Sequence, residues 1–316
     1  MEHTADSEFP KQPSLELPYG ERGLPRWLRS LIHNPISVMG VLLVTFFAVV
    51  AIFAPILAPP KIPSQPYLIP RNGFMAEPQP PSSQDPMGTT QGQYDIYYGV
   101  VWGTRTAFKV GLIVTGVTFL IGGIVGSASG FVGGVIDEVI QRIVEIFLAF
   151  PFLLAALTLA TVLGAKIHNG LITAMIALIA FGWPSYARLI RGDVLTVKER
   201  DYVLAARAVG APGWRILLVH VIPNSIYSLL VVASLDIGTY VLTFAALSFL
   251  GLGAGEGYAD WGQLLSYARN WIPTLNTHWW IVVYPGIALL LFVLGFNLFG
   301  DAFRDALDPT MQGGRG

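Results

Sequence analysis

The sequence has no cysteine and little charge. Without a thiol in its 316 residues, the chain can form neither a disulfide nor a thiolate metal site, and it has no cysteine nucleophile. Charged residues make up 12% of the chain, against roughly 25% in a typical soluble domain. The net charge of −1 gives no reason to expect a nucleic-acid partner.

Motifs for catalysis are also missing. No Gly-x-x-x-x-Gly-Lys-Ser/Thr loop occurs, and none of the five lysines follows a glycine in a phosphate-binding loop. There is no His-Glu-x-x-His, no Gly-x-Ser-x-Gly and no pair of histidines at metal-ligand spacing. We therefore expect no catalytic residue, no metal site and no bound cofactor in this chain. A transport role fits, but its energy source would lie elsewhere.

Long apolar runs dominate what is present. Hydrophobic residues make up 53% of the chain, and the mean hydropathy is +0.58. A helix that crosses a bilayer needs about 20 apolar residues. The sequence therefore predicts an all-α integral membrane protein with six transmembrane helices. These are expected at Ile36–Ala58, Ala107–Phe131, Ile143–Leu163, Leu171–Ile190, Ile226–Leu250 and Trp280–Phe299.

The positive charges predict the orientation of these spans. With the N-terminus inside, 13 of the 19 lysines and arginines fall on the cytoplasmic side. Because cytoplasmic loops are enriched in Lys and Arg, both termini are expected to be cytoplasmic. The predicted segments are a tail (1–35), the first span (36–58), an outside loop (59–105), a core with the other five spans (106–300) and a second tail (301–316).

Two of these segments leave alternatives open. In the first tail, Leu24–Asn34 has apolar residues at helical spacing, which predicts either a helix on the membrane surface or a charged topology anchor. The outside loop has nine prolines between Pro59 and Pro86, so an extended chain is expected there. It is either a surface for an extracytoplasmic partner or a passive linker.

Two features stand out inside the spans. Gly122, Gly126, Gly130 and Gly134 recur every four residues, which favours close helix packing over a substrate contact. Asp236 is the one acidic residue deep inside a predicted span. Ionisable groups at that depth usually face the bundle interior or water. Asp236 either lines a translocation path or is hydrogen-bonded to a neighbouring helix or subunit.

The predicted cytoplasmic loop 191–225 contains the stretch DYVLAARAVGAPGWRILLVHVIPN. Its first part has one helical face of mostly small residues, with arginines on another face. Gly210-Ala211-Pro212-Gly213 ends this helix, and a second helix is expected at Trp214–Val221, closed by Pro223. The pattern predicts a hairpin that either docks in a groove of another protein or lies on lipid headgroups. The residues of the first face are Tyr202, Ala205, Ala206 and Val209, and the arginines are Arg200 and Arg207.

Several motifs resemble one known family in the same order along the chain. "AARAVG" followed by "HVIPN" resembles the EAA loop of the inner-membrane subunits of binding-protein-dependent ABC importers. "WPSYARLIRGDVL", "LSFLGLG", "DWGQLL" and "FNLFGDAFRDALDP" resemble the dipeptide/oligopeptide branch, and within it the C-type permeases. The resemblance covers roughly residues 25–310. It implies the type I importer permease fold in a prokaryotic plasma membrane.

The resemblance also implies partners. A B-type permease would form the other half of the pore, separate ATPase subunits would bind ATP and Mg, and an extracytoplasmic protein would bind the substrate. Peptides are the implied substrates, with nickel, glutathione or oligosaccharides as alternatives. The EAA-like loop would couple the permease to the ATPase. Its coupling residues would be Asp201, Ala205, Ala206, Arg207, Gly210, Pro223 and Asn224.

The chain departs from the family pattern at four positions. Leu204 stands where the loop often has Glu, and Phe244 stands where many relatives have Glu. Thr90 and Gln93 replace an Asp and an Arg in the outside loop, so that this loop is expected to meet its partner differently. A rival from another class is a secondary transporter or channel that works alone, with Asp236 as an ion or proton site.

Overall fold

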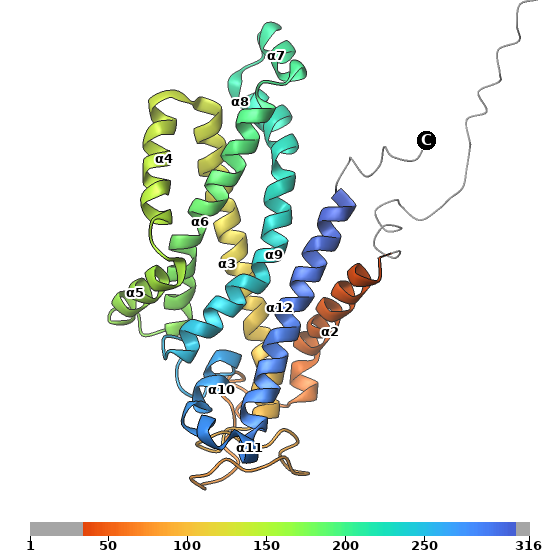
Figure 1. Cartoon of the computed structure of the whole chain (residues 1–316), viewed down its shortest axis with the longest axis vertical. Coiled ribbons are helices and arrows are strands. Elements are labelled where there is room, and N and C mark those ends of the chain that lie inside the picture. The colour runs from red at the N-terminus through yellow and green to blue at the C-terminus, as the bar shows by residue number, and fades with distance from the viewer. Residues whose placement is uncertain (1–33, 308–316) are drawn as a thin grey trace, which may run out of the picture.

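The structure is a computed structural model that describes residues 34–307 (Figure 1). Within that range the chain is helical, and the β structure is limited to three isolated bridges. The predicted surface helix at Leu24–Asn34 lies almost entirely outside the described residues, as does the end of the chain from residue 308.

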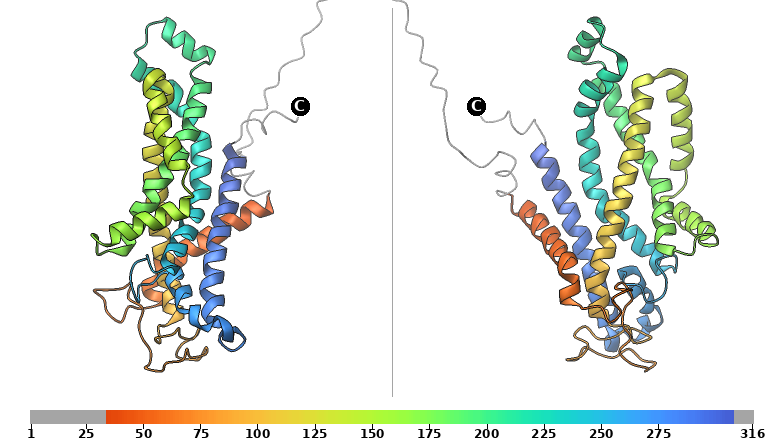
Figure 2. Two further views of the ribbon diagram at one scale, coloured as in Figure 1. Left: turned by 60° about the vertical axis from the view of Figure 1, so that its left-hand side comes forward. Right: turned by 180° about the vertical axis from the view of Figure 1, so that it is seen from behind.

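Five helices are long and apolar enough to cross a membrane, and a bent pair would make a sixth span. This confirms the all-α, multi-span fold class. The long helices are α2 (Pro35–Leu57), α3 (Ile96–Val132), α6 (Gly170–Val197), α9 (Ile222–Phe249) and α12 (Trp280–Leu307). Most of them run roughly along the long axis of the molecule in Figures 1 and 2, and α2 is tilted away from it. α3, α6 and α12 run in one direction, and α9 runs in the opposite direction.

Short polar side chains start several of these helices. Asn34 accepts a hydrogen bond from the Ile36 amide at 3.1 Å, and Pro35 occupies the first helical position of α2. Asp95 caps α3 through the Tyr98 amide at 3.1 Å, and Asn169 caps α6 in the same way. An N-cap acceptor satisfies one of the amides that the first turn leaves unpaired, so these residues fix where each helix begins.

The predicted third span is wrong as a single straight helix. The chain instead forms α4 (Gly134–Leu148) and α5 (Phe152–Gly164), which meet at an angle of 87°. Pro151 stands between them. Proline has no amide hydrogen and disfavours helical backbone at the residue before it, here Phe150, so the helix ends at this point.

Two predicted boundaries are also corrected. α3 begins at Ile96, so the outside loop ends at residue 95 and not at 105. With 37 residues α3 is about 55 Å long, well beyond a bilayer core of about 30 Å, so part of it extends beyond the core. At the other end of the chain, α12 continues to Leu307 and not to 300, and no proline stands between residue 300 and Pro309.

Short helices form the connections at the two ends of the bundle. At one end are α7 (Asp201–Ala208), α8 (Gly213–Arg215) and a π-helical turn, η1 (Ile216–Val221). We call residues 201–221 the hairpin. At the other end are α10 (Trp261–Tyr267), the 3-10 turn η2 (Arg269–Thr274) and α11 (Leu275–His278). We call residues 58–95 together with 250–279 the cap. Figure 1 shows the two at opposite ends.

The bundle has two large apolar clusters, and α3 contributes to both. One joins α3 to α5, α6, α9 and the hairpin, and the other joins α3 to α2, α9, α10, α12 and the cap. Gly126 lets α3 approach α6 closely: a Cβ there would meet the Ala187 carbonyl and would lie 2.5 Å from Ile190 Cγ2. At Gly122 a Cβ would lie 2.6 Å from the Trp183 carbonyl oxygen.

The predicted glycine ridge is shorter than four residues. A Cβ at Gly130 would still have α6 atoms at 3.1 Å, but one at Gly134 would have no atom within 4 Å. Gly134 therefore takes no part in the packing of α3 against α6. The reason is the break after α3: Gly133 and Gly134 both have positive φ (70° and 61°) and turn the chain into α4.

Candidate functional site

The first helix of the hairpin is fixed at both ends by local chemistry. Asp201 opens α7, where a carboxylate interacts favourably with the positive end of the helix dipole. At the other end Gly210 has φ +79° and its amide donates to the Arg207 carbonyl at 3.0 Å. The Ala211 amide donates to the Ala206 carbonyl at 3.1 Å. This pair of bonds is a Schellman motif, which needs a left-handed residue such as glycine.

The predicted second helix of the hairpin is wrong in its end point. Pro223 does not close it, because the helix runs on from Gly213 through η1 into α9, to Phe249. In η1 the hydrogen bonds reach five residues back, as from the Ile222 amide to the Leu217 carbonyl. A π turn shifts the hydrogen-bond register, which lets the helix continue through Pro223. Asn224 donates its side-chain amide to the His220 carbonyl at 2.7 Å.

The hairpin folds onto itself through a small buried seam. Val203 of α7 is fully buried and packs in one cluster with Ile216 and Val221 of η1. Ala206 is half-buried at this seam, and Ala205 and Arg207 are exposed. The structure therefore separates the two neighbouring alanines: one closes the hairpin and the other faces outward.

Several large apolar side chains of the hairpin are exposed. Val209 is 84% exposed and Trp214 is 66% exposed. Exposed apolar patches of this kind mark surfaces that meet another protein or a membrane. We call this group the hairpin surface; its members are Tyr202, Leu204, Val209, Trp214, Leu218 and Val219.

An ion pair ties the bundle together at the hairpin end. Arg191 of α6 donates to both carboxylate oxygens of Asp137 in α4, at 2.7 and 2.6 Å. Asp137 is buried and also accepts from Ser129 of α3. Lys198, beyond the end of α6, donates to the Gly130 carbonyl at 3.0 Å. A two-pronged arginine–carboxylate contact fixes direction as well as distance, so α3, α4 and α6 are held in register here.

Sequence reasoning missed this ion pair. The two residues stand 54 positions apart and no spacing rule connects them. The available signal was weaker: an aspartate in the first turn of α4, three residues after the second of two glycines that turn the chain.

A second candidate site lies midway along the bundle, at the elbow between α4 and α5. It is a pocket of about 170 Å³ between this elbow, α6 and α9. Asp236 of α9 lines the pocket and is the only charged residue that does so. The sequence analysis singled out this carboxylate, and the structure shows that most of the residues that line the pocket with it are aromatic.

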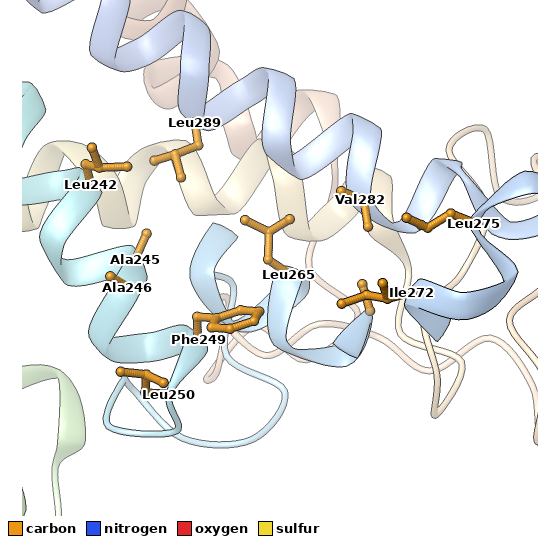
Figure 3. A pocket seen from close by; sticks show the side chains of 11 residues that line it. Leu242, Ala245, Ala246, Phe249, Leu250, Leu265, Ile272, Leu275, Val282 and Leu289 are labelled. Carbon is orange, nitrogen blue, oxygen red and sulfur yellow. The ribbon is translucent and has the colours of Figure 1, made fainter. Parts of the chain in front are cut away.

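A larger groove near the cap has the opposite chemistry. It has a volume of about 500 Å³ and is lined by apolar side chains of α9, α10, η2, α11 and α12 (Figure 3). Phe249, Leu265 and Ile272 are among the side chains drawn there. With no polar lining residue, the groove offers no group that could orient a polar ligand.

Most of the departures from the family pattern are internal. Thr90 and Gln93 are buried, and the Gln93 side-chain amide donates to the Met75 and Glu77 carbonyls at 3.0 and 2.6 Å. Gln93 thus holds the cap together from within. Phe244 is buried in the core beside α6. Leu204, in contrast, is 43% exposed on the hairpin surface.

The architecture defines a class: a multi-pass helical membrane protein with a short hairpin at one end and a folded cap at the other. Two family descriptions match its sequence. "Binding-protein-dependent transport system inner membrane component" matches residues 119–313. "N-terminal TM domain of oligopeptide transport permease C" matches residues 26–81.

Similar proteins agree with these matches. The dipeptide transport system permease protein of Alkalihalophilus pseudofirmus is 37% identical over 284 residues, covering 90% of this chain and 89% of the relative. The oligopeptide transport system permease protein of Bacillus subtilis is 34% identical, covering 92% of each. The glutathione transport system permease protein of Pectobacterium atrosepticum is 35% identical, covering 73% of this chain and 75% of the relative.

The chain therefore belongs to the inner-membrane permeases of binding-protein-dependent ABC importers. Within that family it belongs to the C-type permeases of the dipeptide/oligopeptide branch.

Proposed function

We propose that this chain is one transmembrane subunit of an ATP-driven peptide importer in a prokaryotic plasma membrane. It forms half of the translocation pore, and a B-type permease forms the other half. An extracytoplasmic binding protein delivers the substrate at the cap end. Peptides are the proposed substrate class because relatives named for dipeptides and oligopeptides match most of the chain. Glutathione, nickel and oligosaccharides are the alternatives within the importer class.

The hairpin is the proposed contact with a cytoplasmic ATPase, which binds the ATP and Mg. The observation that carries this proposal is the hairpin surface, with side chains as large as Trp214 left exposed. Asp201 and Gly210 set the two ends of α7, whereas Ala205 and Arg207 face outward. Ala206, Pro223 and Asn224 support the hairpin from behind or from its base, and we assign them a positioning role.

Force applied to the hairpin can reach the bundle directly. η1 continues into α9 without a break, and the Arg191–Asp137 ion pair holds α6 to α4 just below. A docked hairpin would therefore move with α9 as a rigid body when nucleotide binding changes the ATPase. For this to drive transport, ATP binding must favour one of the two orientations of the permease pair.

The test uses the assembled importer in proteoliposomes. Ala205→Trp adds bulk to the exposed face of α7 without touching the buried seam. We expect it to prevent co-purification with the ATPase and to abolish ATP-driven peptide uptake. The matched control is Ala165→Trp, which places the same side chain on an exposed alanine after α5, away from the hairpin.

Two outcomes contradict the proposal. If Ala205→Trp leaves both assembly and uptake unchanged, the hairpin is not the docking element. If the permease alone transports substrate without ATP or partners, and Asp236→Asn abolishes its ion coupling, the chain is a stand-alone secondary transporter or channel.

A further inference from the structure

The pocket at the α4–α5 elbow combines one carboxylate with several aromatic rings. Phe147 of α4 packs against Phe181 of α6 with ring centres 5.5 Å apart, and Phe152 of α5 lies 6.1 Å from Tyr240 of α9. The rings therefore come from every element around the pocket. The lining residues are Phe147, Leu148, Phe150, Phe152, Phe181, Gly182, Ser185, Asp236, Thr239 and Tyr240.

The Asp236 carboxylate has no cationic partner among the described residues. Three ion pairs occur there, and none of them includes Asp236. The neighbouring donor is the Tyr186 hydroxyl. That buried hydroxyl makes no hydrogen bond of normal distance and angle. The carboxylate is thus poorly compensated within the part of the chain that the structure describes.

The depth of the pocket makes this costly. Asp236 stands in the middle of α9 (Ile222–Phe249), and the facing Phe181 and Ser185 stand in the middle of α6 (Gly170–Val197). A charged side chain near the centre of a bilayer costs about 3 kcal/mol on insertion scales and is normally paired or in contact with water. A carboxylate at this position therefore requires a cation or a proton.

The surrounding groups favour a small organic cation. Aromatic faces attract a cation within about 6 Å of the ring centre. An ammonium group has three donors, and Asp236, Ser185 and Thr239 supply acceptor oxygens around the pocket. A metal ion fits less well, because no group of three metal-ligating side chains occurs in the described residues. The volume of about 170 Å³ equals only about five or six water molecules at roughly 30 Å³ each.

We propose that this pocket binds the N-terminal ammonium group of a peptide in transit, with Asp236 as its counter-ion and the phenylalanine rings around it. This inference rests on the proposed peptide import. It assigns the permease its own preference for substrates with a free amino terminus. The pocket has room for the first residue of a peptide, and the rest of the peptide would extend out of it.

The test compares two peptides of identical sequence, one with a free N-terminus and one N-acetylated, in proteoliposomes that contain the complete importer. The quantity measured is the ratio of their ATP-driven uptake rates. Asp236→Asn keeps the shape of the side chain and removes its charge. We expect the ratio to fall by about tenfold, the size expected for loss of one charge-assisted hydrogen bond. Asp236→Glu keeps the negative charge, so its ratio of uptake rates should stay close to that of the wild type.

The control is Glu138→Gln, which removes one exposed carboxylate near the start of α4, away from the pocket. It should leave the ratio unchanged. The binding protein is the same in every sample, so its own preference cancels when variant and wild type are compared. If Asp236→Asn stops all uptake, the ratio of uptake rates is measured on Asp236→Glu and on Thr239→Val instead. Thr239→Val should lower this ratio by about threefold, because it removes a neutral hydrogen bond, which is weaker than a charged one.

Two results would overturn the inference. An unchanged ratio in these variants means that the pocket does not bind the amino terminus. In the second result, the B-type permease is lost when the Asp236→Asn complex is purified, while the uptake ratio of the remaining complexes is unchanged. That result would mean that the carboxylate pairs with a lysine or arginine of the B-type permease. Absence of any peptide uptake by the wild-type importer contradicts the proposed function itself.

Discussion

Trp261 in the cap is 2% exposed, and Trp214 in the hairpin is 66% exposed. The Trp261 ring lies edge-on to Phe47 and Phe292, with ring centres 6.0 and 5.5 Å away, and its indole N–H donates to the Val100 carbonyl at 3.1 Å. Trp214 belongs to neither of the two large apolar clusters. Trp261 is thus fully packed in the cap, whereas Trp214 is largely exposed on the hairpin.

Polar groups tie the cap to the bundle. The Thr106 hydroxyl of α3 donates to the Ala259 carbonyl at 2.7 Å, and the Trp102 indole of α3 donates to the Ala58 carbonyl at 2.8 Å. Asp260 is buried, accepts from the Gly262 amide at 3.0 Å and starts α10. These contacts pack the cap against the bundle, whereas the hairpin has one narrow seam and leaves Val209 and Trp214 exposed.

The largest expected effect comes from the cap tryptophan. Trp261→Ala should lower the free energy of unfolding by about 3–5 kcal/mol, because it removes a fully packed ring and its hydrogen bond to the Val100 carbonyl. Thermal unfolding of the purified permease in detergent measures this loss. A loss of unfolding free energy below about 1 kcal/mol would show that the packing of Trp261 does not stabilise the cap.

The buried carboxylate in the cap gives a pH dependence. Burial, which outweighs its hydrogen bonds, raises the pKa of Asp260 from 3.8 to about 6. The folded protein therefore holds this proton more tightly than the unfolded chain does. Its contribution to stability is full below pH 3.8 and is lost as the pH rises through about 6, a change of about 3 kcal/mol.

Asp260→Asn tests this expectation. The variant has no carboxyl group to titrate, so its melting temperature should fall less than that of the wild type between pH 4 and pH 7. Identical pH profiles for the two proteins would contradict the assigned protonation.

An intermediate effect is expected at the base of the hairpin. Asp137→Asn leaves the Arg191 guanidinium without its charge partner, which destabilises a partly buried pair by about 2 kcal/mol after allowance for solvent screening. The control is Glu145→Gln in the same helix, since Glu145 pairs with Arg142 at 3.0 Å and both side chains are well exposed. Chemical unfolding monitored by tryptophan fluorescence should separate the two variants, and equal midpoints would show that the buried ion pair adds no stability.

The smallest effect on stability is expected for the hairpin tryptophan. Trp214→Ala should change the unfolding free energy of the isolated permease by less than about 0.5 kcal/mol, because the ring has few contacts to lose. In the assembled importer the same variant should weaken co-purification with the ATPase. A large loss of stability in the isolated chain would mean that Trp214 is structural, and the contrast with Trp261 would disappear.

Local sequence signals predicted much of the hairpin. Gly210 followed by Ala211-Pro212-Gly213 predicted the end of α7, and the end has the left-handed glycine that such a pattern requires. Pro223 misled the prediction, because a proline usually ends a helix, whereas here a π turn absorbs it. Pro151 has the opposite effect: it lies inside the predicted span Ile143–Leu163 and divides it into α4 and α5.

The sequence by itself determined the membrane class, the number of apolar segments, the lack of an ATP-binding loop and the single carboxylate deep in a span. These follow from composition and from periodicity within one segment. The tertiary structure alone decided which residues meet: Asp137 with Arg191, Gly126 with Ala187, and Asp236 with four phenylalanines. The physical reason is that these contacts join helices far apart in sequence, so they depend on how the helices pack.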